Sequence, residues 1–157
     1  MTVLLFDAAA DPAPLAALHA ACFPHAWDSA ALRSLLAGPG VFAFTASHQG
    51  AMAGFILARA AGGEAEILTL AVLASARGAG LGRVLMQAAA AGAAALGAQT
   101  MFLEVGTDNP AALTLYSGLG FQRAGQRKGY YDSHSQTVTG RDALVLKAAL
   151  PLRGDLA

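Results

Sequence analysis

The 157-residue sequence predicts a single α/β domain, covering residues 1–157, with a mixed, mostly antiparallel sheet whose central parallel pair of strands is flanked by helices. Three observations predict it. Three strand-like segments follow one another across short glycine-containing connections, a strand–helix–strand unit comes next, and two strand-like segments close the chain. No repeat or linker interrupts this order, and the length suits one hydrophobic core.

The N-terminal third predicts one short strand and two helices. An Asp followed by Pro, as at Asp11 and Pro12, is typical of a helix start. The residues 23–27 break that helix, and an Asp-Ser pair caps the next one. The expected elements are a strand at 3–6, a helix from 11 to about 22, and a helix from 28 or 29 to near 38.

The middle of the chain predicts the centre of the sheet. The runs 41–47, 52–59 and 64–72 are strand-like, and the short glycine-containing connections between them predict an antiparallel meander. A helix over 81–96 and a buried strand over 100–105 follow. Because strands joined by a crossover helix run parallel, the strand 64–72 should pair in parallel with 100–105.

The C-terminal third predicts one more helix and a strand pair. Asn109 followed by Pro110 starts a helix that ends near residues 118–120. The segments 121–131 and 142–148 are expected to form the closing antiparallel pair, and the polar stretch 132–140 between them is expected to be an exposed, mobile loop.

Composition excludes several classes of protein. Lys plus Arg equals Asp plus Glu at ten each, so there is no basic excess for a nucleic-acid partner. The apolar stretch 84–98 is shorter than the ~20 residues that span a bilayer, and the N-terminus lacks the pattern of a secretory signal. We therefore expect a cytoplasmic protein with no membrane or direct nucleic-acid partner.

Residue types that bind metals are sparse. The single cysteine, Cys22, rules out an internal disulfide and a multi-cysteine metal site. The histidines show no metal-ligand spacing, so we expect no metal and place each of these side chains on the surface or in a loop. They are His19, His25, His48 and His134.

A glycine-rich turn lies between the predicted strand 64–72 and the predicted helix 81–96. Its glycines let the backbone approach a ligand, and the helix start offers free N–H groups and a positive dipole end, which favours a phosphate or pyrophosphate. A dinucleotide fingerprint would need glycine where Arg83 stands, and a P-loop motif is absent. A turn without a ligand stays an alternative. The turn comprises Arg77, Gly78, Ala79, Gly80, Leu81 and Gly82.

Two carboxylates and one tyrosine are candidates for acid–base chemistry. Glu104 interrupts an apolar strand, where desolvation strengthens a carboxylate as a proton acceptor, and Glu66 lies in an earlier strand. Tyr116 follows Asn109 by about two helical turns, so the two share a face, and its phenol can protonate a leaving thiolate. The alternatives are solvated strand-end glutamates, a tyrosine packed in the core and an asparagine that only caps its helix.

Two blocks of the sequence resemble the GNAT superfamily of N-acetyltransferases. Arg77, Gly80 and Gly82 fit the superfamily's coenzyme-binding pattern of Arg or Gln, two residues, Gly, one residue, and Gly or Ala. The block 103–121, LEVGTDNPAALTLYSGLGF, is more specific and resembles the ribosomal-protein alanine N-acetyltransferases of the RimI type. The likeness runs from about residue 64 to 149 and implies the GNAT fold.

The resemblance implies a role for each candidate. Glu104 matches the family's general base and Tyr116 its general acid, while Glu66 coincides with the catalytic glutamate of other GNAT branches. The implied reaction is direct acetyl transfer from acetyl-CoA to the N-terminal α-amine of an alanine in a ribosomal protein, within a ternary complex. The implied coenzyme-binding residues are Leu70, Ala71 and Val72 on the strand, Arg77, Gly78, Ala79, Gly80, Leu81 and Gly82 in the turn, and Asn109.

The sequence departs from the family pattern near the implied base. Gly106 replaces the family's arginine and Asp108 its serine. The implied acceptor groove lies between residues 23–27 and 132–140, and two extra residues separate Phe-Pro from Trp in the first of these. Three alternatives stay open: acetylation of a small-molecule amine or a protein lysine, a non-catalytic acyl-CoA-binding protein, and a covalent route through Cys22.

Overall fold

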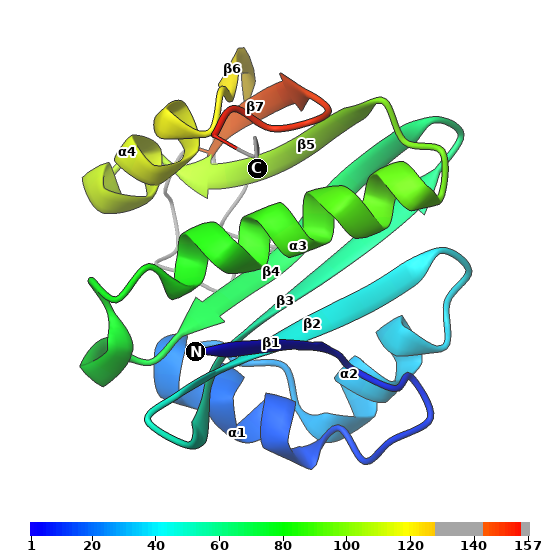
Figure 1. Ribbon diagram of the computed structural model, residues 1–157, viewed down its shortest axis with the longest axis vertical. Coiled ribbons are helices and arrows are strands. Elements are labelled where there is room, and N and C mark those ends of the chain that lie inside the picture. The colour runs from blue at the N-terminus through cyan, green and yellow to red at the C-terminus, as the bar shows by residue number, and fades with distance from the viewer. Residues whose placement is uncertain (128–142, 155–157) are drawn as a thin grey trace.

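The structure, a computed structural model, describes residues 1–127 and 143–154 (Figure 1). The order of its elements agrees with the sequence prediction, apart from a short 3-10 turn before the longest helix. The elements are β1 (Thr2–Leu5), α1 (Ala13–Cys22), α2 (Ser29–Leu36), β2 (Val41–His48), β3 (Ala51–Ala61), β4 (Glu64–Val72), η1 (Ala74–Ala76), α3 (Leu81–Ala95), β5 (Thr100–Gly106), α4 (Pro110–Gly118), β6 (Gln122–Arg127) and β7 (Ala143–Ala149).

The described strands form one mixed sheet of order β1-β2-β3-β4-β5-β7-β6 (Figure 1). Strands β1 to β4 pair as an antiparallel meander, β4 and β5 are parallel, and β7 pairs antiparallel with both β5 and β6. The predicted meander, parallel pair and closing antiparallel pair are therefore confirmed. The last strand lies between β5 and β6, so β6 forms an edge of the sheet.

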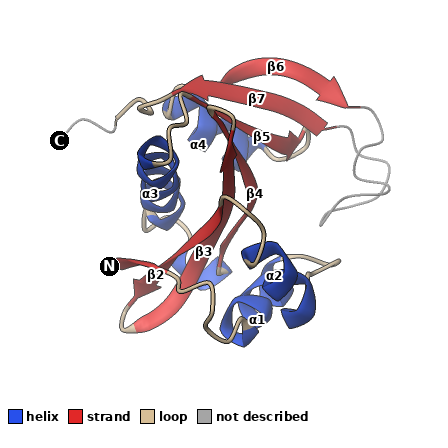
Figure 2. Cartoon of the chain, turned by 90° about the vertical axis from the view of Figure 1, so that its right-hand side faces the viewer, coloured by secondary structure: helices blue, strands red, loops and turns tan. Residues whose placement is uncertain are grey.

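Helices cover both faces of the sheet. Figure 2 shows α1 and α2 against one face and α3 against the other. The first face buries a cluster that includes Leu15, Leu32 and Phe55, and the second buries a larger cluster that includes Leu85 and Met86 together with residues of α4 and β5. Each fully buried side chain of this size contributes roughly 1.5–3 kcal/mol to folding, so the two clusters hold the sheet between its helices.

The helix starts follow the capping residues in the sequence. The Asp28 carboxylate accepts a hydrogen bond from the Ala31 N–H at 2.8 Å, and the Asn109 side-chain oxygen accepts one from the Ala112 N–H at 3.2 Å. The predicted caps of α2 and α4 are therefore confirmed. Helix α1 begins slightly later than predicted, at Ala13, with Pro12 as its N-cap, and the Asp11 carboxylate accepts a hydrogen bond from the Ala13 N–H at 3.0 Å.

One extra residue in β4 reverses the direction of its side chains. Leu57 on β3 pairs with Thr69 and Ala58 pairs with Ile67, so Leu68 has no partner in the β3 register and forms a bulge. Ile67 packs into the cluster on the α3 side, whereas Thr69, two residues later, points to the α1 side and contacts that helix. Beyond the bulge, β4 thus presents a different set of side chains to each face.

The central parallel pair separates soon after it forms. Strands β4 and β5 pair only from Glu64 with Thr100 to Glu66 with Phe102. Strand β4 continues to Val72, while β5 stays paired with β7 along its whole length. On its β5 side, the second half of β4 has no strand partner among the described residues. Backbone groups on this edge can therefore pair with a ligand, apart from the Val72 carbonyl, which accepts from the Cys22 thiol and the Arg77 guanidinium.

One prediction about histidines is wrong. His19 is fully buried, because residues of α1, β4 and the α1–α2 connection enclose its ring. His25 is exposed and His48 is half-buried at the end of β2, as expected. The predicted loop 132–140, with His134, and the part of the predicted strand 121–131 beyond Arg127 lie outside the described residues.

Candidate active site

The glycine-rich turn forms the entrance to α3. Gly78 and Gly80 have φ of 84° and 86°, the left-handed region in which a side chain is strained, and Gly80 is the N-cap of the helix. The first free N–H groups of α3 and the positive end of its dipole therefore lie at the turn, as the sequence predicts. The chemistry of this end of the helix suits a phosphate-bearing ligand.

A cavity of about 560 Å³ opens beside this turn, and we call it the loop cavity. It extends from α3 to the separated end of β4 and the start of α4. All of the sequence-predicted coenzyme residues line it except Ala79. The predicted residues that line it are Leu70, Ala71, Val72, Arg77, Gly78, Gly80, Leu81, Gly82 and Asn109, joined by Tyr116.

Several residues of the loop cavity were not assigned to it from the sequence. They come from α1, from the residue after it, from η1 and from α4, and nothing in their local pattern indicates that these segments meet. Arg83, the residue that follows the turn, also lines the cavity. The others are Cys22, Phe23, Ala76, Ala111, Ala112 and Leu115.

Cys22 contacts β4 but is poorly suited to act as a nucleophile. Its thiol donates to the Val72 carbonyl at 3.5 Å, and the Arg77 Nε–H donates to the same carbonyl at 3.2 Å. Burial raises the pKa of the thiol, although the neighbouring Arg77 guanidinium opposes that shift. The reactive form of a cysteine is the thiolate, so the structure does not favour the covalent route.

A second, smaller cavity of about 110 Å³ lies where β4 and β5 separate, and we call it the gap cavity. Glu104 and Gly106 of β5 line it together with Tyr116 of α4 and Phe23. Phe23 and Tyr116 also line the loop cavity, so the two cavities are neighbours. The structure therefore brings both predicted catalytic side chains to the place where the parallel strands separate.

Tyr116 is held firmly in this position. It lies on the last full turn of α4, whose start is fixed by the Asn109 cap, and its ring packs edge-on against Phe121 with centroids 5.9 Å apart. The residue is 8% exposed, and burial raises the pKa of its phenol to about 12. The hydroxyl therefore keeps its proton throughout the physiological range and is a hydrogen-bond donor.

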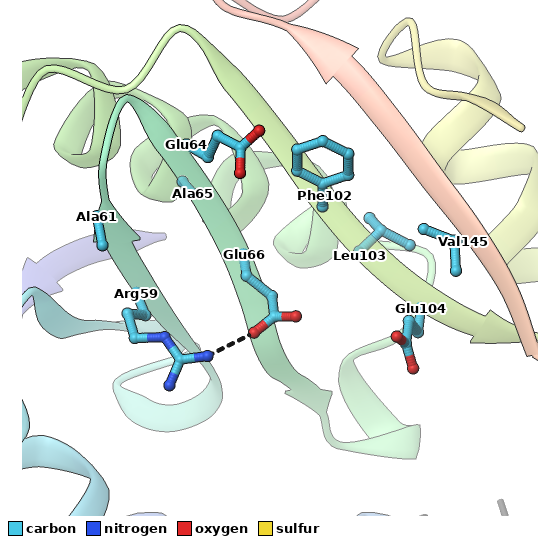
Figure 3. A pocket seen from close by; sticks show the side chains of 9 residues that line it. All are labelled: Arg59, Ala61, Glu64, Ala65, Glu66, Phe102, Leu103, Glu104 and Val145. Carbon is cyan, nitrogen blue, oxygen red and sulfur yellow. Dashed lines mark hydrogen bonds and ion pairs between the residues drawn. The ribbon is translucent and has the colours of Figure 1, made fainter. Parts of the chain in front are cut away.

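A third cavity of about 330 Å³ lies on the other side of Glu104, and we call it the face cavity (Figure 3). Figure 3 shows Glu66 and Glu104 on neighbouring strands, both lining this cavity. Glu66 accepts a hydrogen bond from the Arg59 guanidinium at 2.9 Å. Glu104 lines both the face cavity and the gap cavity, and its Oε2 atom is buried.

The two candidate bases are thereby placed differently. Glu66 lines the face cavity but neither of the cavities that contain Tyr116, and one of its oxygens is engaged by Arg59. Glu104 lies at the boundary between the gap cavity and the face cavity. A proton acceptor must reach a substrate atom within hydrogen-bonding distance, so position favours Glu104.

A sheet that opens beside a glycine-rich helix start, with a carboxylate and a phenol at the opening, is the arrangement expected of a transferase whose donor is a phosphate-bearing coenzyme. The chain belongs to the acetyltransferase (GNAT) family, whose model matches residues 13–121.

Its relatives include two bacterial enzymes. The N-alpha-acetyltransferase RimI of Mycobacterium tuberculosis is 35% identical over 77% of this chain and 74% of its own length. The ribosomal protein bS18-alanine N-acetyltransferase of Escherichia coli is 36% identical over 69% of this chain and 70% of its own. The crystal structure of the E. coli ribosomal-protein-S18-alanine N-acetyltransferase superposes with a TM-score of 0.82 at 26% identity, covering 99% of this chain and 97% of that one.

The described residues add two observations on other functions. None of their helices is long and apolar enough to cross a membrane. Among the same residues, no three His, Cys, Asp or Glu side chains are grouped so that they could hold a metal ion.

Proposed function

We propose that the protein transfers an acetyl group from acetyl-CoA to the N-terminal α-amine of a ribosomal protein that begins with alanine. One observation carries this proposal. Glu104 and Tyr116 line the same gap cavity, which adjoins the loop cavity on one side and the face cavity on the other. The name of the enzyme at 36% identity supports the alanine of a ribosomal protein as the acceptor, and the name of the enzyme at 35% identity supports an α-amine.

The loop cavity fits the shape and chemistry of coenzyme A. The free N–H groups at Gly80 and Gly82 suit its diphosphate, and Arg83 adds a guanidinium at the cavity wall. The unpaired edge of β4 beyond Glu66 offers backbone groups to the amides of the pantetheine arm. An acetyl thioester bound in this way would end in the gap cavity.

The residues around the gap cavity divide the chemical steps between them. Glu104, directly or through a water, accepts the proton of the attacking amine. A backbone N–H of the separated β4 edge donates to the carbonyl oxygen as negative charge develops there. Tyr116 donates to the sulfur as the carbon–sulfur bond breaks and the thiol of coenzyme A leaves. Holding both substrates at the gap makes the encounter effectively intramolecular.

Reference pKa values favour an α-amine over a lysine as the acceptor. An α-amine has a pKa of ~7.7–8.0 and a lysine one of ~10.4. Near pH 7.5, roughly a third of α-amines but only about one lysine in a thousand are neutral, by the same values. A single carboxylate base therefore suffices for an N-terminal substrate.

The acceptor is tested with a panel of amines. The purified protein is incubated with acetyl-CoA and, separately, with a peptide of the bS18 N-terminal sequence, the same peptide with a blocked N-terminus, a lysine peptide and a polyamine. We expect coenzyme A release and a mass increase of one acetyl group only on the free alanyl peptide. Turnover of the polyamine or lysine peptide with none on the alanyl peptide would refute the proposed acceptor.

One observation favours a second candidate, a small-molecule amine. Gly106 lines the gap cavity at the position where the resembling family carries arginine. The missing side chain leaves room and removes a positive charge beside Glu104. The polyamine arm of the same panel tests this alternative.

Replacing Tyr116 with Phe is expected to reduce kcat about 10- to 100-fold. A hydrogen bond to a charged group contributes roughly 1.5–3 kcal/mol, and each 1.4 kcal/mol corresponds to about tenfold. The phenol, with its pKa of about 12, acts as a donor to the departing sulfur. Steady-state kinetics at saturating substrates checks this, with calorimetry to show that coenzyme A binding is retained. Unchanged kcat would remove Tyr116 from the mechanism.

Replacing Gly80 with Ala is expected to weaken coenzyme A binding about tenfold. An L-residue in the left-handed region costs roughly 1–2 kcal/mol, which the turn relieves by reorienting its N–H groups. Gly63→Ala is a matched control, because Gly63 has φ of 83° and equally open space in the distant β3–β4 hairpin. Calorimetric titration with coenzyme A should show lost affinity only for Gly80→Ala. Equal affinity in both variants would separate the turn from coenzyme binding.

A further inference from the structure

A buried histidine links three segments around the site. The His19 ring is fully buried on α1, and its Nε2 lies 3.2 Å from the Thr69 hydroxyl on β4. The backbone N–H of Trp27 donates to its Nδ1 at 3.0 Å. The Trp27 ring stacks on the imidazole with centroids 4.9 Å apart and an angle of 8°, and the Phe23 ring lies at 4.5 Å.

These contacts define the chemical form of the ring. Because the Trp27 N–H donates to Nδ1, that nitrogen carries no hydrogen, and the neutral imidazole must carry its proton on Nε2. The Nε2–H then donates to the Thr69 hydroxyl. Desolvation by burial lowers the pKa of His19 to about 4, so the ring is neutral at physiological pH. Both of its nitrogens are therefore used in holding other segments.

Two residues that contact His19, Thr69 and Phe23, also line the cavities of the candidate site. Thr69 is adjacent to Leu70, which lines the loop cavity and the gap cavity, and Thr69 itself lines the gap cavity. Phe23 lines both cavities too and contacts the same imidazole. His19 thus contacts both β4, beyond the point where it separates from β5, and an aromatic residue that lines the gap cavity.

We propose that His19 is a positioning residue that holds Phe23 at the gap cavity and thereby sets the size of the acceptor residue that the site admits. The inference rests on the proposed acetyl transfer at the gap, but not on the identity of the acceptor. Trp27, in the connection after α1, covers the imidazole and donates its N–H to Nδ1.

The proposal is tested by two pairs of variants. His19→Asn keeps an acceptor near the Trp27 N–H and loses the donor to Thr69, whereas His19→Gln places a donor toward Thr69 and loses that acceptor. Thr69→Val removes the hydroxyl with little change of shape, and Thr69→Ser restores it. His48→Asn, at the distant end of β2, controls for the loss of an imidazole.

Two readouts are measured on each variant. The first is the ratio of kcat/KM for an alanyl peptide to that for the same peptide beginning with leucine; a simple loss of folded enzyme lowers both values equally and leaves the ratio unchanged. The second is the fluorescence of Trp27, the single tryptophan of the chain, which reports its stacking on His19.

We expect the ratio to fall about five- to tenfold in Thr69→Val and in both His19 variants, with Thr69→Ser and His48→Asn close to wild type. Altered Trp27 emission in the His19 variants together with an unchanged ratio would overturn the proposal. So would a ratio that falls equally in Thr69→Ser and Thr69→Val. If the wild type acetylates another amine and no alanyl peptide, the proposed acceptor is refuted. The ratio of kcat/KM is then measured between a small and a large amine of the class that the enzyme accepts. Acetylation of no amine at all would overturn both inferences.

Discussion

Replacing Glu104 with Gln is expected to lower kcat by about 10²- to 10⁴-fold, the range that a positioned general base contributes. The glutamine has nearly the same shape, so the gap cavity and the face cavity should keep their walls. What it loses is the capacity to accept the proton of the attacking amine. Coenzyme A binding should change little, because Glu104 does not line the loop cavity.

Glu66→Gln is the matched control for this prediction. Glu66 lines the face cavity and pairs with Arg59, so its replacement is expected to change the acceptor KM more than kcat. Measuring kcat for both variants at saturating acetyl-CoA, together with coenzyme A affinity by calorimetry, separates the two residues. A larger loss of kcat in Glu66→Gln than in Glu104→Gln would assign the base to Glu66.

Local signals in the sequence predicted most of the fold. The caps at Asp28 and Asn109 gave the helix starts, and the glycine-containing hairpins between 41 and 72 gave the antiparallel order. The bulge at Leu68 could not be predicted. The run EAEILTLAV reads as one continuous strand, and only its pairing with β3 and its contact with α1 reveal the extra residue.

The candidate site was predictable where its residues lie close together in the sequence. The turn from Arg77 to Gly82 and the block around Glu104 and Tyr116 each carry a pattern of their own. Cys22 carries none, because it reaches the cavity only through the packing of α1 on β4. The resemblance placed Phe23 at the acceptor groove, but nothing in the sequence indicates that it also lines the loop cavity. The same packing explains why the burial of His19 was missed.

Acidification is expected to destabilise the protein through His19, and the sign follows from its two pKa values. The pKa is 6.5 in an unperturbed histidine and about 4 in the folded protein, where desolvation by burial disfavours the charged ring. Between these values the unfolded chain binds more protons than the folded one, so the free energy of unfolding rises with pH. The contribution is fully present above about pH 6.5 and is lost as the pH falls toward 4.

The full loss over this window is about 3 kcal/mol, since one pKa unit corresponds to 1.36 kcal/mol, and about 2 kcal/mol of it should occur between pH 7.5 and 5. The upper part of this pH window lies above the pH range in which Asp and Glu ordinarily titrate, so the change in stability there comes from histidine. Urea unfolding at pH 7.5, 6 and 5 measures the effect. His19→Gln should be less stable at pH 7.5 but nearly independent of pH over this range, and His48→Asn should keep the wild-type slope. Parallel slopes in the wild type and His19→Gln would show that His19 has the same pKa in the folded and the unfolded chain, so that burial does not disfavour its charged form.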